Sequence, residues 1–283
     1  MRLGRMTGHQ NLNHGGTQPL SNDHLRAIAP SIFAERPWHE MSTKYAFIPT
    51  IQVVDRLRSE GFQPFAALQS TSRIPGKGDF TKHMIRFRDA RGSSSRSFAA
   101  AGGDLLVPEV LVINAHDGMS AYHCMSGIFR FICENGLVVC DGESSQMSVR
   151  HAGNTDGVID VTYELVEDFP RILNAVDEWS QLRLAPPQQK AFAAAALELR
   201  YDEGKAPVSA EQILTPRREA DKTPTLWNTY NVVQEHLVDG GQRGRNTTSH
   251  RRQRTRPVNG ISESTKLNKA LWRLAEEMKK LAC

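Results

Sequence analysis

The chain has 283 residues, of which 39% are hydrophobic and 23% charged, with four cysteines and a formal net charge of +4. This composition is typical of a globular protein with one large domain or two modest ones. The N-terminal residues lack the apolar core of a signal peptide, and the sequence has no run of about 18 apolar residues. We therefore expect a cytoplasmic protein with reduced thiols and no membrane association.

Charge is distributed unevenly along the sequence. Residues 243–283 contain eleven Lys/Arg and three acids, a balance of +8, so residues 1–242 carry −4. Residues 134–168 hold eight acids and one arginine. Such sorting predicts one surface that meets a polyanion and an acidic region that could contact a protein partner. The alternative is that both are ordinary solvated faces.

The first half of the chain predicts an α+β domain. Residues 1–22 are expected to be disordered, and residues 23–153 to form a mixed domain with a mainly antiparallel sheet. Thr50 is expected to cap a helix that Gly61 ends, since glycine tolerates the left-handed conformation.

Two strands are predicted within this domain. In residues 81–90 the alternation places Lys82, Arg86 and Arg88 on one face, which we expect to be exposed and basic, and Phe87 on the other. A more apolar strand is expected over residues 109–118, ending at a turn.

Residues 125–141 fit two structures. Asn135-Gly136 is typical of a hairpin, which would place Arg130 opposite Asp141. The same residues also fit a helix from Met125 that Gly136 stops, followed by a strand, and this second interpretation is slightly favoured.

The second half of the chain is predicted to be mostly helical. Apolar residues recur at three- and four-residue spacing in six segments after residue 154, Ser209 and Gln212 fit a capping box, and Pro186 fits a helix start. We expect a helical region over 154–239, a basic loop over 240–262 without periodicity, and an amphipathic helix over 263–283.

Motifs for nucleotide chemistry are missing from the sequence. A phosphate-binding loop needs G-x-x-x-x-G-K-[ST], and the nearest match, at residues 75–78, lacks the first glycine and the hydroxyl. No dinucleotide fingerprint, nucleophile elbow or H-E-x-x-H occurs. We expect no cofactor and no catalytic residue.

A metal site is the main enzymatic alternative. His116, Asp117, His123 and Cys124 lie close in sequence, and Cys133 and Cys140 follow. Structural zinc sites usually pair ligands two to four residues apart, which these cysteines do not do, and isolated thiols are commonly buried. The favoured interpretation is therefore a turn and a core rather than a metal site.

Two basic tracks are the candidate nucleic-acid contacts, because arginine binds phosphate oxygens two at a time. The first follows the predicted strand and the loop before it: Arg73, Lys77, Lys82, Arg86 and Arg88. The second follows the basic loop and the last helix: Arg243, Arg245, Arg251, Arg252, Arg254, Arg256, Lys266, Lys269, Arg273 and Lys280.

Single strands also need aromatic platforms. Phe98, Tyr122 and Trp272 are the candidates, whereas Trp227 and Tyr230, three residues apart on a helix, are expected in the core.

Several segments in order resemble the YafZ/YfjQ/YubP family of plasmid and prophage proteins, a domain of unknown function. They include APSIFAERPWHEMSTKYAFIPT, NAHDGMSAYHCMSGIFRFICENGLVV, ILTPRRE and LWNTYNVVQEHLVDGG, and the resemblance runs from about residue 20 to the C-terminus. It implies a mobile-element protein in a bacterial cytosol.

The leading hypothesis is a non-enzymatic, homo-oligomeric DNA-binding protein of a mobile element, acting as a single-strand annealing or recombination mediator, with single strands favoured over duplex. One alternative is a factor that blocks a host defence or regulatory protein through the acidic region or the helices. The other is a metal-dependent hydrolase or nuclease built on His116, Asp117 and His123.

Overall fold

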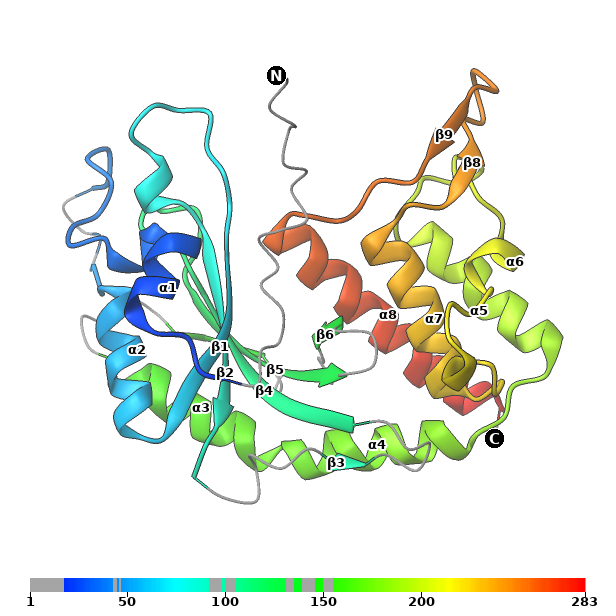
Figure 1. Cartoon of the computed structure of the whole chain (residues 1–283), viewed down its shortest axis with the longest axis horizontal. Coiled ribbons are helices and arrows are strands. Elements are labelled where there is room, and N and C mark those ends of the chain that lie inside the picture. The colour runs from blue at the N-terminus through cyan, green and yellow to red at the C-terminus, as the bar shows by residue number, and fades with distance from the viewer. Residues whose placement is uncertain are drawn as a thin grey trace. The chain divides into compact units, whose positions relative to one another are not determined.

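The computed structural model describes residues 18–42, 45, 47–91, 98–99, 105–130, 135–138, 146–149 and 155–282. The chain divides into two compact units: Met1–Phe98, Leu106–Leu137 and Gly142–Phe169 form the first, and Ala99–Leu105, Val138–Asp141 and Pro170–Cys283 form the second. The α+β prediction is confirmed, because an antiparallel sheet precedes a mostly helical half (Figure 1).

The first unit is built on one sheet. Its strands run in the order β1-β2-β4-β5-β6, with β3 beside β4 and β7 beside β5. The pairs β1–β2, β2–β4, β4–β5 and β5–β7 are antiparallel. The strands are β1 Phe62–Gln69, β2 His83–Asp89, β3 Phe98–Ala99, β4 Leu105–Asn114, β5 Tyr122–Arg130, β6 Asn135–Val138 and β7 Gln146–Val149.

Helices cover one face of this sheet. Helix α2 (Thr50–Ser59) packs on β1, helix α3 (Asp156–Glu167) packs on β5 and β7, and the two helices contact each other (Figure 1). The short helix α1 (Asn22–Ile28) and the 3-10 turns η2 (Pro30–Phe33) and η3 (Gly78–Phe80) complete the unit. On β2, His83 contacts η2 and α2, so Ile85 and Phe87, which alternate with it and are fully buried, also point to this core.

Thr50 is not the cap that the sequence predicts. It is the first residue of α2, whose cap is Pro49, and its buried hydroxyl turns into the unit instead. Thr50 Oγ1 lies 2.9 Å from His83 Nε2 and 3.1 Å from each of His116 Nε2, Tyr122 OH and Asn114 Nδ2. The predicted helix end is confirmed, because Gly61 follows α2 with φ +89°.

The helix favoured for residues 125–141 is wrong. Residues up to Arg130 belong to β5, which pairs with β4 from Leu106–Arg130 to Ile113–His123, and β6 neighbours it. A short apolar run fits a buried strand as well as a helix, and here β4 supplies the partner. The expected pairing of Arg130 with Asp141 lies outside the described residues.

The helical prediction for the second half is confirmed. The capping box at Ser209 and Gln212 is present, and Pro186 is the first residue of its helix. The helices are α4 Phe169–Gln181, α5 Pro186–Glu198, α6 Ala210–Ile213, α7 Leu226–Asp239 and α8 Ile261–Ala282, with the 3-10 turn η6 Glu219–Asp221.

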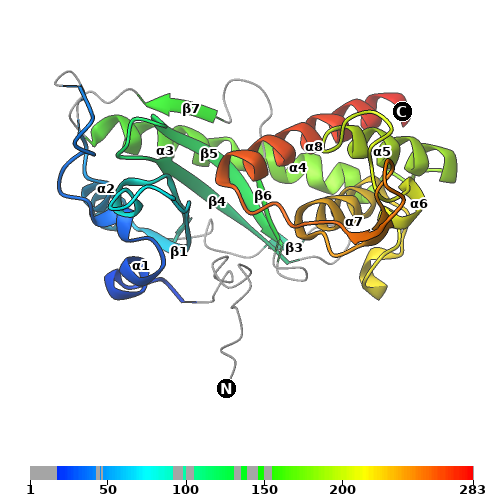
Figure 2. The same ribbon diagram turned by 90° about the horizontal axis from the view of Figure 1, so that it is seen from above.

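Aromatic side chains form the core of the second unit. Trp179 of α4 lies against Trp272 of α8 with ring centroids 4.3 Å apart. Helix α8 also packs against α7, and the two helices are neighbours in Figure 1 and Figure 2. Tyr230 contacts both rings and stacks on Trp227. Trp227 and Tyr230 are therefore core residues, as expected, and Trp272, proposed as a stacking platform, is buried with them.

Two further expectations concern the chain as a whole. Most of the N-terminal segment predicted to be disordered lies outside the described residues, but its end is ordered, because Ser21 caps α1 and Leu20 N donates to Pro64 O. Among the described helices, none combines the length and hydrophobicity needed to cross a bilayer.

Candidate nucleic-acid interface

The segment predicted as a basic loop contains a β-hairpin. Strands β8 (Arg243–Arg245) and β9 (Arg252–Arg254) pair in antiparallel register, and they project beyond the helices of their unit in Figure 1. We call these two strands and the residues between them, 243–254, the arginine ribbon.

Glycines turn the chain from α7 into the ribbon. Gly240 and Gly241 have φ +65° and +80°, values that strain other residues. A Cβ on Gly240 would lie 2.7 Å from the carbonyl of Arg256, so the returning chain passes against it. The turn is closed by Gly241 N donating to Thr255 O and Thr255 N donating to Gln242 O, both at 2.9 Å.

Asn246 organises the tip of the ribbon. Its side-chain oxygen accepts from Thr248 N at 3.0 Å and Ser249 N at 2.7 Å, an Asx-type turn. His250 adopts φ +54° and donates from its backbone to Asn246 O. The tip is therefore closed by local hydrogen bonds.

The register gathers four arginines on one face. Arg243 pairs with Arg254 and Arg245 pairs with Arg252, while Gly244 pairs with Gln253 between them. Residues directly opposite in an antiparallel pair share a face, and so do residues two apart. All four arginines are exposed, as is Arg251 just before β9.

The opposite face of the ribbon packs on its own unit. A Cβ on Gly244 would lie only 2.0 Å from Pro207 O, and Arg245 N donates to that same oxygen at 2.9 Å. From α6, Gln212 Nε2 donates to Arg243 O at 3.0 Å. These contacts hold β8 against its own unit while the arginine face stays exposed.

The positive charge of this face is not balanced by neighbouring acids among the described residues. Within the described part of the chain, no carboxylate lies in ion-pair contact with any of the four arginines. Like charges directly opposite on paired strands are destabilising. An anion bound across the face would relieve this repulsion.

The predicted basic face of β2 is not exposed. Arg86 and Arg88 are buried, and both donate to the buried carboxylate of Glu109 on β4, Arg86 Nε at 2.5 Å and Arg88 Nε at 2.8 Å. Both guanidinium groups also lie about 5 Å from the ring of Phe129. Burial lowers the pKa of Arg88, although Glu109 acts in the opposite direction. The expectation of a solvent-facing basic strand is wrong, because a facing acid and an aromatic ring cover it.

The remaining cations of the first track are scattered. Lys82 is half-buried, and Lys77 Nζ lies 3.3 Å from an Asp117 oxygen. Arg73 is exposed in the loop between β1 and β2.

The last helix is partly neutralised. Arg273 and Lys280 both contact Glu277, Lys266 is exposed, and Lys269 is half-buried. Arg256 is exposed just beyond the ribbon, and its carbonyl accepts from Arg200. The two predicted tracks therefore reduce to one concentrated patch, the arginine ribbon, with single cations elsewhere.

The residues considered for a metal do not converge. His116 bonds to Thr50, Asp117 to Lys77, and Cys124 is fully buried, which raises the pKa of its thiol to about 12. His123 lies on β5 opposite Ile113. No group of three or more His, Cys, Asp or Glu is placed to hold a metal within the described ranges, and Cys133 and Cys140 lie outside them.

Two of the three aromatic residues predicted to stack on bases are buried. Tyr122 is fully buried with its hydroxyl donating to Ile48 O, and Trp272 is in the helical core. The side chain of Phe98 lies outside what the structure describes. The described surface thus offers arginines but none of the stacking partners that the sequence suggested.

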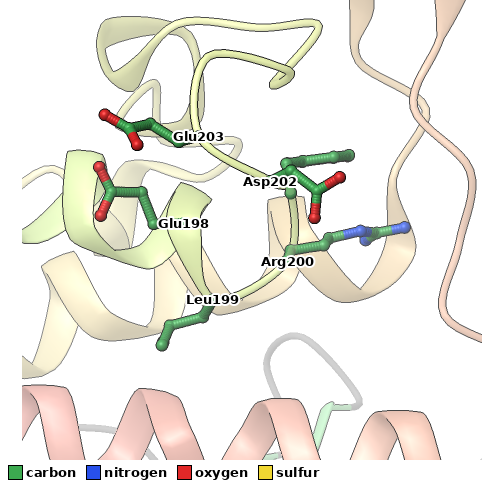
Figure 3. Close-up of a pocket in the computed structure, with 6 residues that line it drawn as sticks. Glu198, Leu199, Arg200, Asp202 and Glu203 are labelled. Carbon is green, nitrogen blue, oxygen red and sulfur yellow. The ribbon is translucent and has the colours of Figure 1, made fainter.

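One acidic hollow lies at the end of α5. Figure 3 shows Glu198, Asp202 and Glu203 around a space of about 470 Å³, with Arg200 beside them. Asp202 is paired with Lys205 at 2.8 Å, and Arg200 donates to the Arg256 carbonyl. Asp202 and Arg200 therefore make contacts within the loop and with the chain that leaves the ribbon.

The four arginines were predicted as contacts, but the hairpin that places them on one face was not, although the sequence carries a signal for it. R-G-R and R-Q-R, separated by six mostly polar residues, alternate in the way two short strands would. Because no apolar residues occupy the alternate positions, this alternation does not predict a strand by the usual criterion.

Comparison with known proteins places the whole fold in a family. The family model "Domain of unknown function (DUF932)" matches residues 37–272. The chain is 41% identical to the UPF0380 protein YafZ and 40% identical to the UPF0380 protein YfjQ, both of Escherichia coli (strain K12), over 262 residues and 92% of each chain. No solved structure matches it. The matched region includes the sheet, the helical half and the arginine ribbon, and the protein belongs to the DUF932 family.

Proposed function

We propose that this protein binds nucleic acid without catalysing a reaction, through contacts from the arginine ribbon to backbone phosphates. The observation that carries the proposal is the register of β8 and β9, which places four exposed arginines on one face with no described carboxylate to pair them. Phosphate contacts of this kind position a protein on nucleic acid without reading sequence.

The energetics favour a polyanion over a single small anion. Each phosphate that an arginine neutralises releases condensed counterions, which gives an affinity that falls steeply with salt. Four arginines with fixed spacing on a packed ribbon supply several such contacts at once. A role in DNA processing on a plasmid, phage or integrative element is consistent with this binding mode.

The test compares two variants of equal charge. The ribbon variant carries Arg243→Ala, Arg245→Ala, Arg252→Ala and Arg254→Ala. The control variant carries Arg36→Ala, Arg56→Ala, Lys190→Ala and Lys222→Ala, which removes four exposed cations outside the ribbon. Both changes lower the formal charge from +4 to 0, so long-range attraction is matched.

Fluorescence anisotropy with labelled single-stranded and duplex oligonucleotides across a salt series is the measurement. If at least two ribbon arginines contact phosphates, the ribbon variant should lose roughly 50-fold or more in affinity at about 100 mM salt, with a shallower salt dependence. The control variant should stay within a few-fold of wild type. Equal losses in the two variants, or no binding by the wild-type protein at low salt, would reject the proposal.

A further inference from the structure

The arginines of the ribbon form two parallel columns. Arg243 and Arg245 stand on β8, and Arg254 and Arg252 stand opposite them on β9. Directly opposite residues have Cβ atoms about 4.5–5.5 Å apart, and residues two apart on a strand are separated by about 6.8 Å. The face therefore carries two rows of positive charge, one along each edge.

Two rows of cations match two rows of phosphates. The major groove of B-form DNA is about 12 Å wide and admits a two-stranded β-ribbon, with one phosphate backbone along each wall. Resting on the proposed function, we propose that the arginine ribbon lies face-down in the major groove of duplex DNA, with each column directed toward one backbone. A single strand would offer phosphates to one column only.

The back of the ribbon supports this docking. Gly244 lies against Pro207, and Gln212 donates to Arg243 O, so β8 is held by its own unit while the arginine face stays exposed. The tip is closed by Asn246. A preformed ribbon loses little conformational entropy on binding, which favours a rigid groove over a flexible chain.

The composition of the ribbon opposes single-strand recognition. Residues 240–260 contain no Phe, Tyr or Trp. Proteins that bind single strands usually combine a basic groove with aromatic rings on which bases stack. Duplex RNA is disfavoured for a different reason, since its A-form major groove is too deep and narrow for side chains to read.

The experiment uses the full-length protein with one sequence in three forms: duplex DNA, either single strand of DNA, and duplex RNA. Anisotropy titrations give affinity, and dimethyl sulfate footprinting of the duplex gives the groove. Guanine N7 lies in the major groove and adenine N3 in the minor groove, so the two methylation products report separately.

We expect duplex DNA to be bound on the order of tenfold or more tightly than single-stranded DNA or duplex RNA at about 100 mM salt, since only it serves both columns. Guanine N7 should be protected by the wild-type protein and by the control variant, and exposed with the ribbon variant. Adenine N3 should be unaffected.

The possible results distinguish docking in the major groove from the proposed function, which is nucleic-acid binding through the ribbon. Ribbon-dependent binding that prefers single strands, or that protects adenine N3 instead of guanine N7, overturns the groove assignment and leaves nucleic-acid binding in place. Binding that does not depend on the ribbon, or no binding to any of the three forms, overturns both.

Discussion

The same short pattern, R-x-R on a β-strand, has two different fates in this protein. On β2, Arg86 and Arg88 are buried, bonded to Glu109 and covered by Phe129. On β8 and β9, the arginines are exposed and face arginines across the ribbon.

The neighbouring strand makes the difference. β4 supplies the carboxylate of Glu109, which lies one residue beyond the Phe87–Val110 pair and contacts both arginines of β2. β9 places an arginine opposite each arginine of β8. An arginine pair therefore holds a sheet together when its partner strand supplies an acid, and it presents charge to a ligand when the partner strand supplies more cations.

The largest effect should come from removing the acid on β4. Glu109→Ala leaves two buried guanidinium groups without their carboxylate, and Arg86 Nη2 already has no hydrogen-bond partner among the described residues. We expect a loss of about 3–5 kcal/mol in the free energy of unfolding, measured by chemical denaturation.

The control for this change is Glu203→Ala, which removes an exposed carboxylate and should cost under about 0.5 kcal/mol. Affinity for DNA, measured below the unfolding transition, should be unaffected by Glu109→Ala. A cost under about 1 kcal/mol would show that the buried triad is not an energetic centre of the sheet.

An intermediate effect should follow acidification, through a buried histidine of the sheet. Burial lowers the pKa of His83 to about 4, against the opposing effect of the Thr81 carbonyl. An imidazole in the unfolded chain has a pKa near 6.5. Between these values the unfolded chain takes up a proton that the folded protein rejects, so stability falls as the pH falls, by up to about 3 kcal/mol.

Denaturation midpoints measured from pH 7.5 down to about 4.5 test this dependence, with His83→Gln as the control that should make it shallower. The slope that remains includes His236, whose pKa burial also lowers. Guanidinium groups stay charged across this range. DNA affinity should therefore not fall on acidification wherever the protein is folded. A stability that is constant with pH in the wild-type protein would contradict the assignment of a neutral, buried His83.

The smallest effect on stability should come from making the ribbon resemble the sheet. Arg252→Glu places a carboxylate opposite Arg245, and such a cross-strand pair should stabilise the hairpin by about 0.2–1 kcal/mol. DNA affinity should nevertheless fall by on the order of tenfold or more, since a contact is lost and a repulsive charge is added.

Arg252→Gln distinguishes the two contributions, because it removes the cation without adding an acid and should give an intermediate affinity. Amide hydrogen exchange in residues 243–254 reports the stability of the hairpin. Unchanged affinity in Arg252→Glu would mean that this cross-strand pair does not touch the nucleic acid.

The sequence predicts much of the fold but little of the burial. The alternation around β2 assigns Arg86 and Arg88 to one face correctly, since that depends only on the geometry of a strand. Whether the face meets water depends on Glu109 and Phe129, which reach it through pairing with two later strands. Such pairing is non-local and leaves no trace in the strand's own residues.

Burial was easier to predict in the helical half, because each helix buries an apolar stripe that is visible in its own sequence. Trp227 and Tyr230 follow this rule. The arginine ribbon does not, because its strands have no apolar stripe. The ribbon is fixed by the close approach of Gly244 to Pro207 and by the turn that the Asn246 side chain closes at its tip. Neither contact is visible as periodicity.

The hydroxyl of Thr50 has more polar neighbours than it can form hydrogen bonds with. It can donate one hydrogen and accept two, yet four polar groups lie within 3.1 Å of it. Asn114 Nδ2 can only donate, and Tyr122 gives its own hydrogen to Ile48 O. At most one of His83 Nε2 and His116 Nε2 can then receive the threonine hydrogen. The tautomers of His83 and His116 are therefore not independent of each other. Through Thr50, the first residue of α2, the proton position on a histidine of β2 is coupled to that on the histidine just after β4.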